Sequence, residues 1–151
     1  MSDYFKNINE IIYEGPDSDN PLSFKYYDEN RQVLGKTMKE NLRFATCYWH
    51  TFTWPGLDPF GGATFERPWM SSGDPLKMAE MKLDEAFDFF NKIKTSFFCF
   101  HDRDISPEGS NYKETQKNFL YIIDLIQSKM ETSKVKLLWG TANAFSHKRY
   151  M

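Results

Sequence analysis

The sequence Phe97-Phe98-Cys99-Phe100, followed directly by His101-Asp102-Arg103-Asp104, decides the fold. Four consecutive apolar residues are typical of a strand buried on both faces, as in a parallel sheet. The chain then supplies a titratable His101 and, three residues later, a carboxylate that can turn back to the imidazole. Because ligands of α/β proteins bind at the carboxyl ends of strands, the position favours a functional pair. The alternative is a His that closes the strand, with Asp104 capping the next turn.

Two amphipathic helices surround this strand in the sequence. Asp74-Pro75 is typical of a helix start, and Asn111 can cap a second helix with Glu114 at capping-box distance. The apolar stripe of the first helix is Leu76, Ala79, Leu83, Ala86, Phe87, Phe90 and Ile93, and that of the second is Phe119, Ile122, Ile123, Ile126 and Met130.

The remaining segments predict two further strands. Residues 43–52 are rich in aromatic and β-favouring residues, and residues 135–139 form a short apolar run. We expect one or two helical turns in 34–41, a long loop over 53–73 and a loop over 104–110. The resulting order β-α-β-α-β predicts an α/β fold with a parallel sheet, either doubly wound and open or part of a barrel. The first strand is not followed by a glycine-rich phosphate loop, which disfavours a dinucleotide-binding domain.

The composition is that of an ordinary globular domain. The chain has 151 residues, of which 40% are hydrophobic and 17% aromatic, and its net charge is −2. A core of useful size is therefore possible, and disorder is disfavoured. The absence of a basic run argues against nucleic acid as a partner, and no apolar stretch predicts a membrane span. Without an apolar signal-like segment at residues 1–6, we expect a cytoplasmic protein.

Further candidate residues follow the other two strands. Trp49 and Trp139 can form flat walls of a ligand site, and Thr141 supplies a hydroxyl. Phe60 lies between Pro59 and two glycines, where an exposed ring can insert into a neighbour or a pocket. Packing in the core or under the loop is the alternative for each of these residues.

The sequence predicts no metal site in this chain. It has no His-x-x-x-His or Cys-x-x-Cys spacing and no cluster of carboxylates with a His at the strand ends. Cys47 and Cys99 each lie in an apolar run. Buried, reduced thiols are expected there, with a disulfide or metal pair as the alternative.

The chain resembles the N-terminal part of xylose isomerase, in the longer form of that family that carries an N-terminal arm. The matching blocks are Leu42-Arg43-Phe44-Ala45, Tyr48-Trp49-His50-Thr51-Phe52, Trp54-Pro55-Gly56, Asp58-Pro59-Phe60-Gly61, Thr64-Phe65, Arg67-Pro68-Trp69, Phe97 to Asp104 and Leu137-Leu138-Trp139-Gly140-Thr141-Ala142-Asn143. The resemblance runs through the whole chain in order and at matching spacing.

This resemblance implies an aldose–ketose isomerase that interconverts D-xylose and D-xylulose, and D-glucose and D-fructose, on a TIM barrel. It implies that His101 and Asp104 help to open the sugar ring, and that Trp49, Trp139 and Thr141 bind substrate. It implies that Phe60 enters the site of a neighbouring subunit in a homotetramer. Two divalent cations, Mg, Mn or Co, are implied for the complete enzyme, and none for this chain alone.

Three strands cannot close an eight-stranded barrel. We expect an N-terminal arm over 1–33 and an incomplete first part of a TIM-barrel domain over 34–151. The chain alone is expected to be inactive, and an inert fragment that assembles with itself as a structural module is the alternative. A sugar-binding module that uses Trp49 and Trp139 is a weaker third interpretation, because half a pocket rarely pre-organises a ligand.

Overall fold

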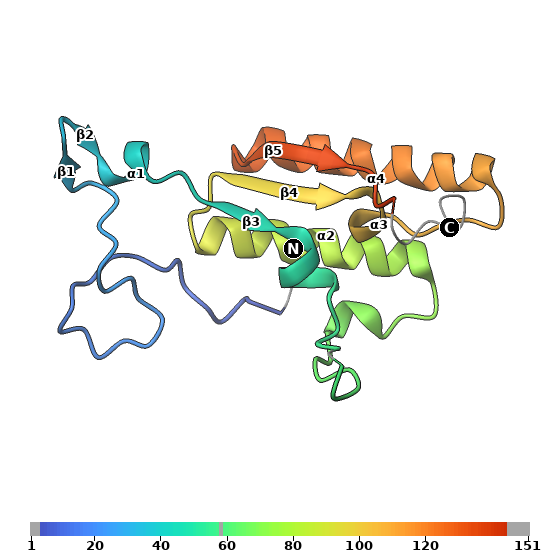
Figure 1. Ribbon diagram of the computed structural model, residues 1–151, viewed down its shortest axis with the longest axis horizontal. Coiled ribbons are helices and arrows are strands. Elements are labelled where there is room, and N and C mark those ends of the chain that lie inside the picture. The colour runs from blue at the N-terminus through green and yellow to red at the C-terminus, as the bar shows by residue number, and fades with distance from the viewer. Residues whose placement is uncertain (1–3, 58, 145–151) are drawn as a thin grey trace.

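The computed structural model describes residues 4–57 and 59–144 (Figure 1). In chain order the elements are β1 (Gln32–Val33), β2 (Lys36–Thr37), α1 (Met38–Asn41), β3 (Ala45–Cys47), the π-helix η1 (Trp49–Thr53), the 3-10 helix η2 (Pro68–Met70), α2 (Pro75–Lys92), β4 (Phe97–His101), α3 (Asp102–Ile105), α4 (Tyr112–Ser133) and β5 (Lys136–Thr141).

A three-stranded parallel sheet in the order β3-β4-β5 forms the centre of the fold. α2 connects β3 to β4 and α4 connects β4 to β5, so each crossover is helical, as the sequence predicts. The register places Cys47 beside Cys99 and His101 beside Thr141. The α/β class and the parallel sheet are confirmed.

The core lies between the sheet and the two long helices. Phe98 is fully buried and stacks on Phe90 of α2 with ring centroids 5.4 Å apart, and Phe87 meets it at 5.5 Å. α4 adds the buried Ile122 and Ile126 to the same cluster. Because side chains alternate along a strand, Cys99 and His101 point to the opposite face of the sheet.

The predicted helix starts are confirmed by their caps. The Asp74 carboxylate accepts hydrogen bonds from the backbone N–H groups of Leu76 and Lys77, at 2.9 and 3.3 Å. The Asn111 side chain accepts from the backbone N–H of Glu114 at 3.0 Å. The Glu114 carboxylate accepts from Ser110 rather than from Asn111, so the expected capping box is not formed.

The predicted strand over 43–52 is wrong beyond Cys47. The strand has only three residues, and η1 begins at Trp49. Tyr48 and Phe52, four residues apart, are both buried with ring centroids 5.2 Å apart. This spacing is helical, and burial of both rings on one side overrides their β propensity.

Two other predicted segments differ from the structure. Residues 34–41 contain only one helical turn, because Leu34 and Gly35 (φ 53° and 79°) form the turn that joins β1 to β2. The loop expected from residue 104 begins later, because α3 includes Asp104 and Ile105.

β5 also continues beyond Trp139, where the sequence predicted its end, to Thr141. A Cβ at Gly140 would lie 3.0 Å from two ring carbons of Phe100. Glycine therefore lets the strand backbone approach the Phe100 ring closely.

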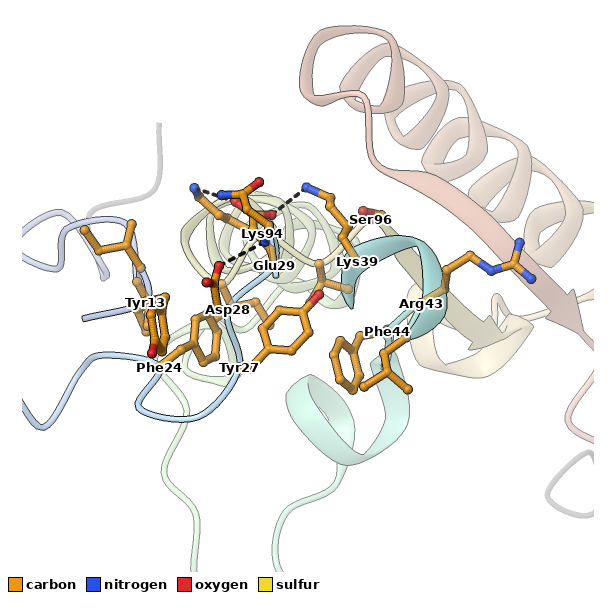
Figure 2. A pocket seen from close by; sticks show the side chains of 16 residues that line it. Tyr13, Phe24, Tyr27, Asp28, Glu29, Lys39, Arg43, Phe44, Lys94 and Ser96 are labelled. Atoms are coloured by element: carbon orange, nitrogen blue, oxygen red, sulfur yellow. Dashed lines mark hydrogen bonds and ion pairs between the residues drawn. The ribbon is translucent and has the colours of Figure 1, made fainter. Parts of the chain in front are cut away.

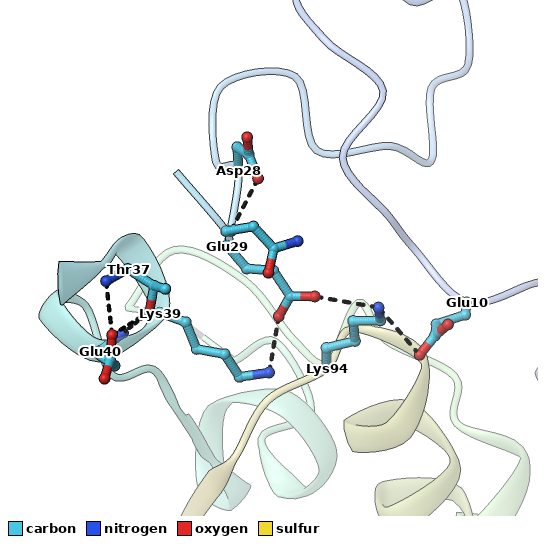
Figure 3. A network of polar contacts seen from close by, with 8 residues as sticks. Glu10, Asp28, Glu29, Thr37, Lys39, Glu40 and Lys94 are labelled. Atoms are coloured by element: carbon cyan, nitrogen blue, oxygen red, sulfur yellow. Dashed lines mark hydrogen bonds and ion pairs between the residues drawn. The ribbon is translucent and has the colours of Figure 1, made fainter. Parts of the chain in front are cut away.

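The N-terminal segment begins beside η2 and α2, where Tyr4 contacts Trp69 and Phe5 contacts Phe89, and then runs to the amino-terminal end of the sheet (Figure 1). Ile11 N–H donates to the carbonyl of Lys92 at 2.7 Å, which ties the segment to the end of α2. Glu29 accepts from Lys39 at 2.8 Å and pairs with Lys94 at 3.4 Å, and Lys94 also lies 3.6 Å from Glu10 (Figure 3). The division of the chain at residue 33 stays a prediction.

Candidate functional site

The end of β4 holds the His101–Asp104 pair in a defined geometry. His101 is the last strand residue, and the single turn of α3 brings Asp104 back to it. Asp104 Oδ2 accepts the backbone N–H of His101 at 2.8 Å and lies 3.0 Å from the imidazole Nδ1. One carboxylate oxygen therefore fixes both the strand end and the ring, and Nε2 is left for another group.

Exposure differs sharply within this pair. The Asp104 side chain is completely buried, whereas that of His101 keeps 34% of its accessible surface. Asp104 Oδ1 has no hydrogen-bond partner within the described ranges. A buried carboxylate beneath a half-exposed imidazole is an arrangement suited to general acid–base chemistry.

Lys82 and Thr53 form a chain of hydrogen bonds that ends at the backbone of Asp104. Lys82 Nζ donates to Thr53 Oγ1 at 3.3 Å, and Thr53 Oγ1 donates to the Asp104 carbonyl at 3.2 Å. Burial lowers the pKa of Lys82 to about 8, and the Asp104 charge acts in the opposite direction. Burial, together with the charge of Asp104, also raises the pKa of the fully buried Tyr48. Sequence reasoning missed Lys82 and Thr53.

A weak signal could have identified Lys82. It lies three residues after Ala79 and four before Ala86, so it shares the face of α2 that packs on the sheet. A lysine on an apolar helix face requires a partner or a route to water. Thr53 carried no comparable signal, because it lies 51 residues from Asp104.

The neighbouring strand brings two more predicted residues to the pair. The Trp139 ring meets the His101 ring edge to face, with centroids 5.5 Å apart and planes at 71°. Thr141 is the register partner of His101 and is exposed. The structure thus gathers His101, Asp104, Trp139 and Thr141 at one end of β4 and β5.

Asp102 ties the next loop to this site. Its Oδ1 accepts the backbone N–H groups of Arg103 and Asn143, both at 2.8 Å. Asp102, the first residue of α3, therefore connects this helix to the segment that follows β5.

The other two predicted site residues, Trp49 and Phe60, lie outside strands β4 and β5. Trp49 begins η1 at the same edge of the sheet and is half-buried. Phe60 is 97% exposed, on a loop between η1 and α2 that projects away from the sheet (Figure 1). The structure does not join Phe60 to the His101 cluster, and its expected place in a neighbouring subunit stays a prediction.

A separate cavity of about 410 Å³ lies at the opposite end of the sheet (Figure 2). Aromatic rings of Phe24, Tyr27 and Phe44 contact one another edge to face along it. On its rim, the hydrogen bond from Lys39 is the main cause that lowers the pKa of Glu29. On this rim Glu29 forms ion pairs with both Lys39 and Lys94.

The described residues contain neither a metal-binding cluster nor a membrane-spanning helix. Within residues 4–57 and 59–144, no three His, Cys, Asp or Glu side chains are close enough to hold a metal ion. Among the helices of the same ranges, none has the length and apolar character needed to cross a membrane.

Comparison with known proteins identifies the relatives of this chain. A xylose isomerase of Photobacterium profundum is 57% identical over all 151 residues. Those of Paraburkholderia phytofirmans and Caldanaerobacter subterraneus subsp. yonseiensis are 58% identical over 147 and 53% identical over 149 residues. The chain resembles xylose isomerases over its whole length. No family profile matches it.

The match to xylose isomerases is one-sided in length. It covers 97–100% of this chain but only 33–34% of each of these three relatives. The chain therefore spans about a third of the length of the curated relatives it matches, which is consistent with an N-terminal part. The resemblance expected from the sequence blocks is confirmed.

Proposed function

We propose that this chain is the N-terminal portion of an aldose–ketose isomerase that interconverts D-xylose and D-xylulose, and D-glucose and D-fructose. Identity above 50% to proteins named xylose isomerase supports the family of reaction. The single observation that carries the mechanism is the 3.0 Å contact between His101 Nδ1 and Asp104 Oδ2. A barrel completed by further strands is part of the proposal.

In this proposal His101 opens the sugar ring. Asp104 holds Nδ1 and stabilises the positive charge that the imidazole gains when Nε2 takes a proton. Nε2 accepts the proton of the anomeric hydroxyl and then returns it to the ring oxygen as the bond between that oxygen and the anomeric carbon breaks. Trp139 supplies a flat apolar wall beside the imidazole, and Thr141 a hydroxyl for a substrate oxygen. Trp49 forms a second wall, and Phe60 reaches a neighbouring subunit of a homotetramer.

Two divalent cations, Mg, Mn or Co, would polarise the substrate oxygens during the hydride shift in the complete enzyme. The described residues of this chain do not fit such a group, because they contain no cluster of three ligands. We therefore assign the cations to parts of the longer protein and derive no step through them.

A chimera tests the proposal. Residues 1–151 would replace the matching segment of the Photobacterium profundum xylose isomerase, and D-xylulose formation would be followed with magnesium present. An active chimera is expected; a folded but inactive one would contradict the proposal. Within it, His101→Gln should lower turnover of the closed-ring sugar about 10²–10⁴-fold and that of the open-chain form less.

The exposed His50 provides the matched control, and His50→Gln should leave both rates within about twofold. Equal losses on both sugar forms with His101→Gln would contradict the ring-opening role. Phe60→Ala should raise KM in the assembled chimera, and an unchanged KM would count against its place in a neighbouring site.

One observation favours a second candidate function. All six residues of β5 are exposed, among them the large side chains of Leu138 and Trp139. We propose that the isolated chain assembles with itself through this edge as an inert module. Light scattering after size exclusion measures the solution mass of the chain with and without magnesium. A defined oligomer whose mass does not change with magnesium supports the module, and a monomer excludes it.

A further inference from the structure

Cys47 and Cys99 form a pair that the proposed isomerase chemistry does not use. They are direct register partners on the parallel strands β3 and β4. Register partners on neighbouring strands point to the same face of a sheet, so the two thiols lie side by side. Both are free, and they are the only 2 cysteines of the chain.

The surroundings of Cys99 favour its protonated form. Cys99 is 6% exposed, and its Sγ lies 3.8 Å from the Thr46 carbonyl as a weak donor. Burial raises the pKa of Cys99 to about 11, and the neighbouring Cys47 acts in the same direction through its charge and a hydrogen bond. Cys47 is half-buried and provides access from solvent. Cys99 is therefore a neutral thiol at neutral pH.

Strand spacing disfavours a direct bond between the two sulfurs. Neighbouring strands lie about 4.7–4.9 Å apart, whereas the Cβ atoms of a disulfide lie about 3.5–4.5 Å apart. A bridge of one additional atom relieves this mismatch. Zinc is a poor bridging atom here, because it requires thiolates and about four ligands, and the described residues offer no cluster of three.

We propose that Cys47 and Cys99 form a binding site for trivalent arsenicals. An aryl arsenoxide reacts with two thiols: both S–H bonds break, two As–S bonds form, and the two protons leave with the oxide oxygen as water. Arsenic stays trivalent, so no oxidant or reductant takes part. The overall reaction consumes two S–H groups and releases no net proton, so the raised pKa of Cys99 slows its attack but does not prevent the bridge from forming. The half-exposed Cys47 reacts first, and Cys99 closes the bridge.

Phenylarsine oxide is the probe, applied to the 151-residue chain in buffer with excess glutathione, and intact mass is measured. Glutathione displaces arsenic held by one thiol, so only bridged arsenic persists. We expect one phenylarsenic group per chain, removed by the dithiol dimercaptopropanol. Absence of an adduct on the folded chain would overturn the proposal.

Three variants test whether arsenic binding requires the β3–β4 register or only the presence of two thiols. Cys47→Ser and Cys99→Ser should each lose the adduct completely; retention in either would overturn the proposal. The third, Cys47→Ser with Thr46→Cys, keeps two thiols but moves one to the opposite face of β3. It should bind at least tenfold more weakly.

Circular dichroism checks that each variant is folded, so that a loss of arsenic binding cannot be caused by a loss of structure. The chain in denaturant provides the last comparison, because it has the same thiols without the register. At least tenfold weaker binding is expected there, since bridging must then close a loop of about 50 residues. Equal binding by the folded and unfolded chain would overturn the assignment to the β3–β4 register.

Discussion

β4 and β5 are neighbouring strands with similarly apolar sequences but opposite burial. The centre of β4 is buried at three consecutive residues, whereas every residue of β5 is exposed. β4 pairs with a strand on each edge, and its Phe98 and Phe100 belong to the core under the helices. Within residues 4–57 and 59–144, β5 is an edge strand of the sheet. The comparison shows that an apolar run stabilises a fold only to the extent that neighbours cover it.

The carboxyl ends of the same two strands are alike. There, β4 supplies His101 and β5 supplies Trp139 and Thr141 to one cluster. Stability and site formation are thus separable: β4 contributes to both, and β5 in this chain contributes chiefly to the site.

Phe98→Ala should give the largest loss of stability. The ring is fully buried and contacts the rings of Phe87, Phe90 and Phe100. Its removal should lower the free energy of unfolding by about 3–5 kcal/mol, through lost burial and the cavity left behind. Denaturant unfolding followed by circular dichroism measures it. A loss below about 1 kcal/mol would mean that β4 does not anchor the core.

Asp104→Asn should cost about 2 kcal/mol, because the fully buried Oδ2 accepts the backbone N–H of His101 and lies 3.0 Å from its Nδ1. Unfolding in denaturant at neutral pH measures the change. Asp102→Asn is the matched control on the same turn; it is only half-buried and should cost less. Equal costs would contradict the special position of Asp104.

Lys82→Met should change how stability depends on pH. The folded pKa of Lys82 is lowered to about 8 from 10.5, so between these values the unfolded state binds more protons. Wild-type stability therefore gains with rising pH in this window, by roughly 1–3 kcal/mol, and the variant lacks that gain. Titratable groups that do not contact Lys82 cancel in the difference between the two proteins.

Unfolding curves at pH 7 and pH 10 measure this difference. Lys77→Met is the control, because Lys77 is exposed near the start of the same helix. An unchanged difference between wild type and Lys82→Met over this range would show that Lys82 is not desolvated.

Leu138→Ser should have the smallest effect, within about 0.5 kcal/mol, because the side chain is 55% exposed on β5. Unfolding in dilute solution, where self-association is low, measures it. A cost above about 2 kcal/mol would show that β5 is covered in solution and would remove the contrast with β4.

Local sequence signals predicted the elements whose stabilising contacts are close in sequence. α2 and α4 were found because Asp74 and Asn111 cap them and their apolar stripes repeat with the helical period. The His101–Asp104 pair was found for the same reason, since its members are three residues apart.

Local sequence signals could not predict the contacts between residues that are far apart in the sequence. The strand expected up to Phe52 became η1, because packing of Phe52 against Trp69, Phe89 and Phe90 depends on elements up to 38 residues away. The exposure of β5 likewise depends on neighbours, to which its own apolar sequence gives no guide.

We propose that Asp104 holds the imidazole of His101 through Nδ1, which leaves Nε2 free for substrate. A long-range ¹H–¹⁵N correlation spectrum of the chain, at a pH where the imidazole is neutral, tests it most directly. Of the 3 histidines, the signals lost in His101→Gln identify the relevant ring. The account predicts a proton on Nδ1, donated to Asp104, and an unprotonated Nε2. A neutral ring protonated at Nε2 would contradict it.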